Sequence, residues 1–125
     1  MAQSMNTTID LTMSATSFQG LNEYGTIMIG DRAFEFYHKR NVNQFIQIPW
    51  EEVDYVIASV LFQGKYIPRY AIRTKKNGTY TFSSKNPKKV LRSINTYVPY
   101  DRMVRSLTFF DVLKRNLKAL FVSKK

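Results

Sequence analysis

The stretch RYAIRTKKNGTYTFSSKNPKKVLRSINTYV, residues 69–98, contains two periodicities in a fixed order. Its first half belongs to two runs, 66–74 and 79–84, in which β-branched and aromatic residues alternate with polar ones, as in half-buried strands. KKNG joins the two runs, and Asn77-Gly78 is a strong signal for a tight β-hairpin. The second half changes to helical spacing. The stretch therefore predicts an antiparallel hairpin followed directly by a helix.

The helix is expected within NPKKVLRSINTYV. Ser84 or Asn86 can cap its first turn, and Pro87 suits the first helical position, where no N–H is needed. Pro99 ends it, because proline cannot continue a helix. Its apolar residues share one face at 3–4 spacing: Val90, Leu91, Ile94, Tyr97 and Val98.

Short strands are also expected before this stretch, with turns between them. Residues 11–18 alternate weakly, Gly30-Asp31 reads as a tight turn between two further strands, and FIQIPW at 45–50 is another. EEVDYVIASVLF, 51–62, fits a helix or a strand, and its β-branched content favours a strand. The order predicts an α+β fold: a pleckstrin-homology- or GRAM-like bent antiparallel β-sandwich of about seven strands, capped by a helix.

Charge is divided unevenly along the 125 residues, whose net charge is +10. Residues 1–60 carry seven acids and three bases, whereas residues 61–125 carry two acids and sixteen bases. This asymmetry favours a polyanionic partner, which can be a nucleic acid, an anionic membrane surface or an acidic protein face. The alternative is a soluble protein with excess lysine.

Candidate catalytic groups are sparse. Glu51-Glu52-Asp54 is the one dense carboxylate cluster, and it reads better as the solvated start of an element than as an acid/base pair. His38 is the sole histidine and has no nucleophile beside it in sequence, and cysteine is absent. Trp50 is expected to be a core anchor rather than an exposed binding residue. We therefore expect a protein that is not an enzyme and uses no cofactor or metal.

The C-terminal stretch TFFDVLKRNLKALFVSKK, 108–125, combines apolar residues at 3–4 spacing with lysines. It can pack on its own domain, lie on an anionic membrane surface or dock into a groove of another protein. Because the strands and helix already end at Val98, an outward role is favoured. The expected organisation is a flexible N-terminus at 1–10, the folded domain at 11–98 and a basic amphipathic helical tail at 99–125.

The run GTIMIGDRAFEFYHKRNVNQFIQIPWEEVDYV, 25–56, and the stretch quoted first also carry a resemblance. Over roughly residues 8–121 the chain resembles a domain-of-unknown-function family of Gram-positive bacteria, encoded beside mannose-class phosphotransferase permeases and often called the mannose-operon regulator. The resemblance implies a pleckstrin-homology-type fold and an accessory or regulatory role for the permease. It brings no catalytic motif.

Together these observations predict a cytoplasmic, non-enzymatic accessory protein that binds the inner side of a mannose-class permease and is peripherally associated with the membrane. A DNA-binding regulator of the same operon and an anionic-phospholipid-binding module are the alternatives, although no nucleic-acid-binding motif is present. No signal peptide or membrane-spanning run is found. The expected partner-binding residues are Arg102, Arg105, Phe109, Phe110, Leu113, Lys114, Arg115, Leu117, Lys118 and Phe121.

Overall fold

The computed structural model describes residues 3–41, 43–60 and 65–106, and within them it is an α+β fold. Eight strands form one sheet in the order β4-β3-β2-β1-β7-β6-β5-β8, which confirms the predicted class. The strands are β1 (Ile9–Ser17), β2 (Glu23–Gly30), β3 (Ala33–His38), β4 (Phe45–Pro49), β5 (Val53–Ser59), β6 (Tyr70–Thr74), β7 (Thr79–Ser84) and β8 (Met103–Ser106). The helices are α1 (Pro87–Asn95) and the 3-10 turns η1 (Trp50–Glu52) and η2 (Tyr100–Arg102).

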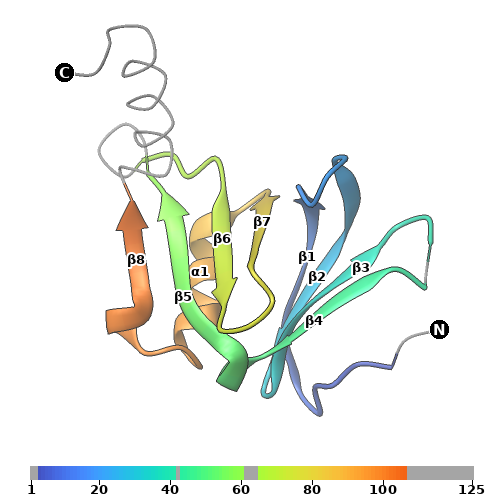
Figure 1. The fold of residues 1–125 in the computed structure, drawn as a ribbon, viewed down its shortest axis with the longest axis horizontal. Coiled ribbons are helices and arrows are strands. Elements are labelled where there is room, and N and C mark those ends of the chain that lie inside the picture. The colour runs from blue at the N-terminus through green and yellow to red at the C-terminus, as the bar shows by residue number, and fades with distance from the viewer. Residues whose placement is uncertain (1–2, 42, 61–64, 107–125) are drawn as a thin grey trace, which may run out of the picture.

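The sheet consists of two antiparallel meanders, β1 to β4 and β5 to β7, with β8 added in parallel beside β5. They are joined where β1 pairs with β7, over Ala15–Ser17 alone, whereas β1 pairs with β2 along its whole length. Because this junction is short, the two halves can diverge, and Figure 1 shows them at an angle with α1 behind β5, β6 and β7. The arrangement lets one core contact both halves.

Phe82 of β7 lies at the centre of that core and is fully buried. Its ring centroid is 5.0 Å from that of Phe34, 5.7 Å from that of Phe36 and 6.0 Å from that of Tyr70. These residues come from both meanders, so Phe82 holds the halves together. From α1, Val90 and Ile94 close the core with no exposed surface.

The hairpin and helix predicted from residues 69–98 are confirmed as elements, although β6 begins at Tyr70 rather than at residue 66, and α1 ends at Asn95 rather than at Pro99. Gly78 has φ of 82°, which glycine adopts without steric cost, and its carbonyl accepts a hydrogen bond from the Thr74 hydroxyl at 2.7 Å. The Asn86 side chain accepts a hydrogen bond from the Lys89 N–H at 3.2 Å, and Pro87 begins α1. Local signals therefore set these elements.

β8 differs from the expectation, which placed residues 99–106 in a helical tail. The segment is instead the turn η2 followed by a strand that pairs with β5 in parallel, Met103 opposite Val56 and Arg105 opposite Ala58. The physical reason is non-local: β8 pairs with β5, which lies far away in sequence, and the chain from β6 to α1 provides the long crossover that a parallel pair requires. The remainder of the predicted tail, from residue 107, lies outside the described residues.

Residues 4–8 also differ from the flexible N-terminus expected over 1–10. Asn6 accepts hydrogen bonds from the N–H groups of Arg32 and Ala33, both at 2.7 Å, and so covers the turn between β2 and β3. The Asp31 carboxylate accepts from the Thr7 N–H at 2.8 Å and from the Thr7 hydroxyl at 2.6 Å. This segment, which we call the N-terminal arm, is therefore part of the fold.

Candidate functional site

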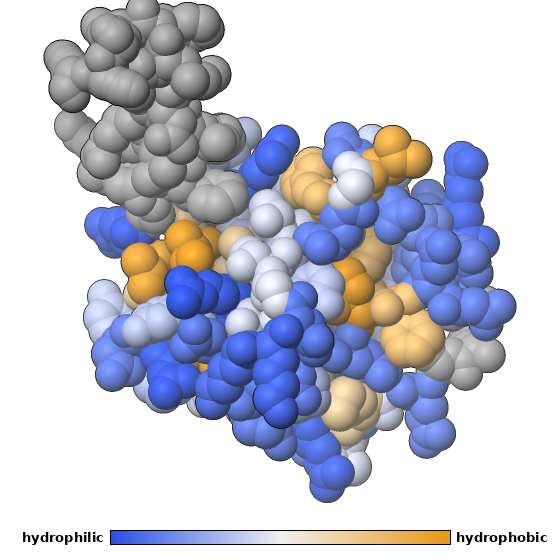
Figure 2. Space-filling view, viewed as in Figure 1, coloured by the Kyte–Doolittle hydropathy of each residue, from blue (hydrophilic) through white to orange (hydrophobic). Residues whose placement is uncertain are grey.

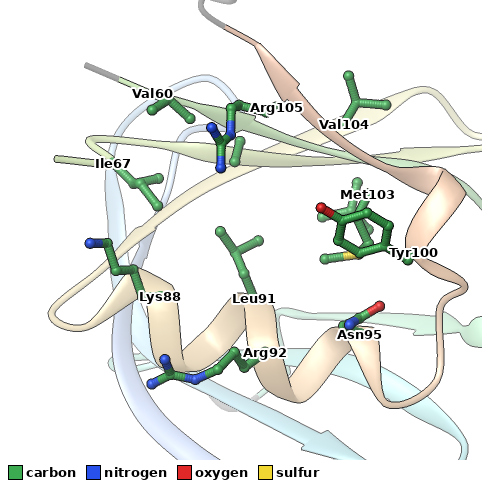
Figure 3. A pocket seen from close by; sticks show the side chains of 12 residues that line it. Val60, Ile67, Lys88, Leu91, Arg92, Asn95, Tyr100, Met103, Val104 and Arg105 are labelled. Carbon is green, nitrogen blue, oxygen red and sulfur yellow. The ribbon is translucent and has the colours of Figure 1, made fainter. Parts of the chain in front are cut away.

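A groove with a volume of about 400 Å³ lies between α1 and the strands β5 and β8 (Figure 3). Its floor is apolar, formed by Val56 and Ala58 of β5 and by Val60 just beyond it, all buried. The groove opens between the flank of α1 and β8, above these residues. An apolar floor of this size at a sheet–helix junction is typical of a binding site.

One flank of α1 forms the first wall. Lys88, Leu91, Arg92 and Asn95 all line the groove, and their spacing of three and four residues places them on one side of the helix. The core-facing side chains of α1 lie on the adjacent side of the helix. Long basic side chains can therefore cover the edge of the floor with their stems while their charged ends stay in water.

The opposite wall comes from β8 and the turn before it. Met103, Val104 and Arg105 of β8 all line the groove. Met103 and Arg105 share one face of the strand, and in Figure 3 Val104, between them in sequence, points away from α1. The exposed ring of Tyr100 closes the groove at the Met103 end. The groove thus has a cationic end and an end with a phenol and an amide.

The charges of the groove are uncompensated. Lys88, Arg92 and Arg105 are exposed, none of them forms an ion pair with another described residue, and the groove's lining contains no acid. Two basic residues elsewhere are engaged: the Arg73 side chain is 3.3 Å from the Asp54 carboxylate, and Arg69 lies over the Phe18 ring at 4.1 Å. The groove is therefore distinguished by three exposed cations beside one apolar floor. The groove can therefore bind an anion that also carries an apolar group.

The outer face of the same strands is partly apolar. Val104 and Ile57 are opposite one another in the β5–β8 register, and Val104 is 38% exposed. Figure 2 shows an apolar patch over β8 and β5, with hydrophilic surface beside and below it. β8 is thus an edge strand with apolar side chains on both faces.

Of the predicted partner-binding residues, only two lie in the described part of the chain. Arg105 lines the groove, whereas the Arg102 guanidinium donates to the Val53 carbonyl at 3.4 Å and is half-buried. The other eight lie outside the described residues: Phe109, Phe110, Leu113, Lys114, Arg115, Leu117, Lys118 and Phe121. Lys88, Leu91 and Arg92 were not predicted as site residues, although their helical spacing marks a common flank.

His38, the sole histidine, forms hydrogen bonds within the turn that follows β3. His38 Nδ1 accepts from the Arg40 N–H at 3.1 Å and from the Asn41 N–H at 3.0 Å, and so caps the turn after β3. Its Nε2 lies 3.6 Å from the Glu23 carboxylate. Among residues 3–41, 43–60 and 65–106, histidine, aspartate and glutamate form no group of three able to hold a metal ion. None of the helices described there is long and apolar enough to cross a membrane.

Trp50 has the anchoring role that the sequence predicts. Its indole N–H donates to the Gly30 carbonyl at 2.9 Å, and its ring stacks on Tyr97 with centroids 5.2 Å apart. The Tyr97 hydroxyl in turn donates to Asp10, and this bond raises the pKa of Tyr97 to about 12. These contacts tie α1 to β1 and β2, away from the groove.

Comparison with known proteins locates the chain in one family. A crystal structure of the C-terminal domain of an unknown protein from Leishmania infantum is similar, with a TM-score of 0.62 and 11% sequence identity. The similarity covers 72% of this chain and 83% of that one, and it concerns the fold alone. The search of curated proteins finds no match. The family model described as Domain of unknown function (DUF956) matches residues 1–117, so the chain belongs to that family.

Proposed function

We propose that this protein is a non-enzymatic accessory protein of a mannose-class phosphotransferase permease, which it binds on the cytoplasmic side of the membrane to modulate uptake or its regulation. Two separate lines support the proposal. The link to the permease comes from the sequence resemblance over residues 25–56 and 69–98. The binding role comes from the groove between α1, β5 and β8.

One observation carries the binding role: three exposed cations that form no ion pair with another described residue line a groove whose floor is apolar. Exposed charges of one sign attract an oppositely charged surface and fix its orientation. The apolar floor supplies the area that is removed from water on contact. The described residues that line the groove include no catalytic set, and we propose that the groove recognises a partner rather than performing chemistry on a substrate.

The fold proposal is more specific than the α+β class. Two antiparallel meanders followed by a helix are the chain order of a pleckstrin-homology-type domain, and we propose that this domain is one, with β8 added beside β5. Such a domain is a scaffold on which different binding sites occur, so the fold by itself does not name the partner.

The tail beyond residue 106 adds to the proposed contact through its composition. It carries five bases and one acid together with the predicted apolar anchors. Basic residues near an anionic leaflet contribute about 1 kcal/mol each to membrane association. We propose that the tail keeps the protein at the inner face of the membrane while the groove binds the permease itself.

The test is affinity purification of the tagged full chain from gently solubilised native cells, after nuclease treatment, with mass spectrometry of the recovered proteins. Mannose-class permease subunits in near-stoichiometric amounts are the expected result. Recovery of no membrane protein, together with loss of all partners on nuclease treatment, would contradict the proposal and favour a DNA-binding regulator. Binding to anionic liposomes with no permease recovered would favour the phospholipid-binding alternative.

Two variants sharpen this test, because they change the net charge equally at different places. The groove variant carries Lys88→Gln, Arg92→Gln and Arg105→Gln. The control variant carries Lys39→Gln, Lys75→Gln and Lys76→Gln, at exposed residues outside the groove. Loss of permease with the groove variant alone supports recognition by the groove, whereas equal loss with both would reduce the effect to net charge.

A further inference from the structure

We propose that the groove binds an acidic amphipathic peptide segment of the partner protein, with an apolar side chain on the floor and carboxylates against the three cations. The inference rests on the proposed function and specifies the chemistry of the same site. It follows from the shape of the groove, from its charge and from the placement of its polar groups.

Shape indicates where the apolar side chain would lie. Leu91 of α1 and Met103 of β8 are both only half-buried, and they face each other across the floor in Figure 3. A large apolar side chain placed between them would contact α1, β5 and β8 together. Its burial would remove apolar surface of both partners from water, which is the main driving force for peptide docking in grooves.

Charge indicates which residues would flank that side chain. Lys88 and Arg92 project from α1, and Arg105 projects from β8, so cations stand on both sides of the floor. An occupant with carboxylates on either side of its apolar residue can pair with both walls. Arginine in particular binds a carboxylate through two parallel hydrogen bonds.

The same charges argue against the chain's own tail as the occupant. Residues 107–125 contain five bases and one acid, so placing them in the groove would bring like charges together. An acidic segment from another protein relieves this repulsion instead.

The polar groups argue for a peptide rather than a lipid chain. Asn95 and Tyr100 lie at the end opposite Lys88, and both line the groove. A hydrocarbon chain whose head bound the cations would pass this exposed amide and this exposed hydroxyl without forming a hydrogen bond to either. A peptide backbone can hydrogen-bond to both, so the groove suits a peptide along its full length.

The experiment is a nuclear magnetic resonance titration of the isotope-labelled full chain. One probe is a short synthetic peptide of leucine and glutamate at helical spacing, and the second probe replaces each glutamate with glutamine. The glutamate peptide is expected to shift the signals of Val56, Leu91 and Met103. Because three partly exposed ion pairs are lost together, the glutamine peptide should bind about tenfold more weakly.

The groove variant should lose the same factor of about ten for the glutamate peptide, and the control variant should lose less than about twofold. Each of four results would overturn the inference: no binding, shifts outside the groove, equal losses in the two variants, or groove shifts with phosphatidylglycerol vesicles but not with the peptide. A chain ending at Ser106 is the last control. If it binds the glutamate peptide and the full chain does not, the tail occupies the groove and the inference is wrong.

This outcome is separable from that of the proposed function. Peptide binding in the groove without recovery of permease subunits from cells would leave the groove chemistry intact and contradict the permease role. Recovery of permease by the groove variant at the level of the unmodified protein would leave the permease role intact and contradict recognition by the groove.

Discussion

Glu35 provides a quantitative test of how the N-terminal arm is held. This carboxylate lies in β3 with no exposed surface, on the side of the sheet that the arm covers. One oxygen accepts from the Ser4 hydroxyl at 2.6 Å and the Asn6 amide at 3.1 Å. The other accepts from the Met5 N–H at 2.7 Å and the Gln47 amide at 3.0 Å. Glu35 is therefore a buried anion held by four donors.

Replacing Glu35 with glutamine changes one acceptor into a donor without changing the size of the side chain. Whichever way the new amide is turned, two of the four donors then face an N–H group instead of an oxygen. Hydrogen bonds to a charged group contribute about 1.5–3 kcal/mol each, and removing the buried charge returns part of that loss. We therefore expect the free energy of unfolding to fall by about 3 kcal/mol.

The assay is urea unfolding at neutral pH, followed by the fluorescence of Trp50, the single tryptophan. Glu51→Gln is the matched control, because Glu51 is exposed, and its effect should stay within about 0.5 kcal/mol. Asn6→Ala completes a double-mutant cycle. Since Asn6 and Glu35 share one network, the two losses should be less than additive by about 1 kcal/mol.

Two results would refute this reasoning. A loss below about 0.5 kcal/mol for Glu35→Gln would mean that the four donors are satisfied equally well by water. Full additivity with Asn6→Ala would mean that the arm and the carboxylate stabilise the fold independently.

Three further predictions concern the sheet, the arm and the tail. Gly25→Ala should lower the unfolding free energy by about 1–3 kcal/mol in thermal or urea melts, because a Cβ there would overlap the Tyr37 carbonyl oxygen. The hydrogen bond from the Thr7 hydroxyl holds the pKa of Asp31 at about 2, below its ordinary 3.8. The stability from this bond is therefore complete above pH 3.8 and is lost as the pH falls through about 2, so the Thr7 amide resonance should titrate there and Asp31→Asn should abolish that titration. A chain ending at Ser106 should give the same melting curve as the full chain. A chain that also lacks β8 should melt at a lower temperature, because β5 loses its edge partner. Equal melting curves for the two truncated chains would show that β8 does not stabilise the sheet.

Elements defined by local chemistry could be predicted from the sequence. Asn77-Gly78 specified a hairpin, and Asn86 with Pro87 specified the start of α1, because caps and turns depend on residues a few positions apart. The β-branched content of residues 51–62 favoured a strand, and β5 occupies Val53–Ser59 within that range. The α+β class followed from the order of these local signals.

Features that depend on distant residues could not be predicted in this way. β8 has only four residues and pairs with β5, which lies far away in sequence, so its pattern was indistinguishable from the beginning of a helix. Glu35 read as an ordinary polar position in an alternating strand, although its four donors come from the arm and from β4. Contacts of this kind require the topology to be known.

One wall of the groove could be predicted from local sequence, and the other wall could not. The sequence placed Lys88, Leu91 and Arg92 on a helix, and their spacing could have identified a shared flank. The facing wall, with Met103 and Arg105, depends on the pairing of β8 with β5. A site formed between a helix and an unpredicted strand could therefore be recognised only in the folded chain.

The central claim is that the groove face recognises a mannose-class permease. The most direct measurement compares the permease subunits recovered with the groove variant and with the control variant, after nuclease treatment and at equal protein levels. The account predicts a loss of about tenfold for the groove variant and nearly full recovery for the control variant. Equal recovery with both variants, or no permease with the unmodified protein, would contradict it.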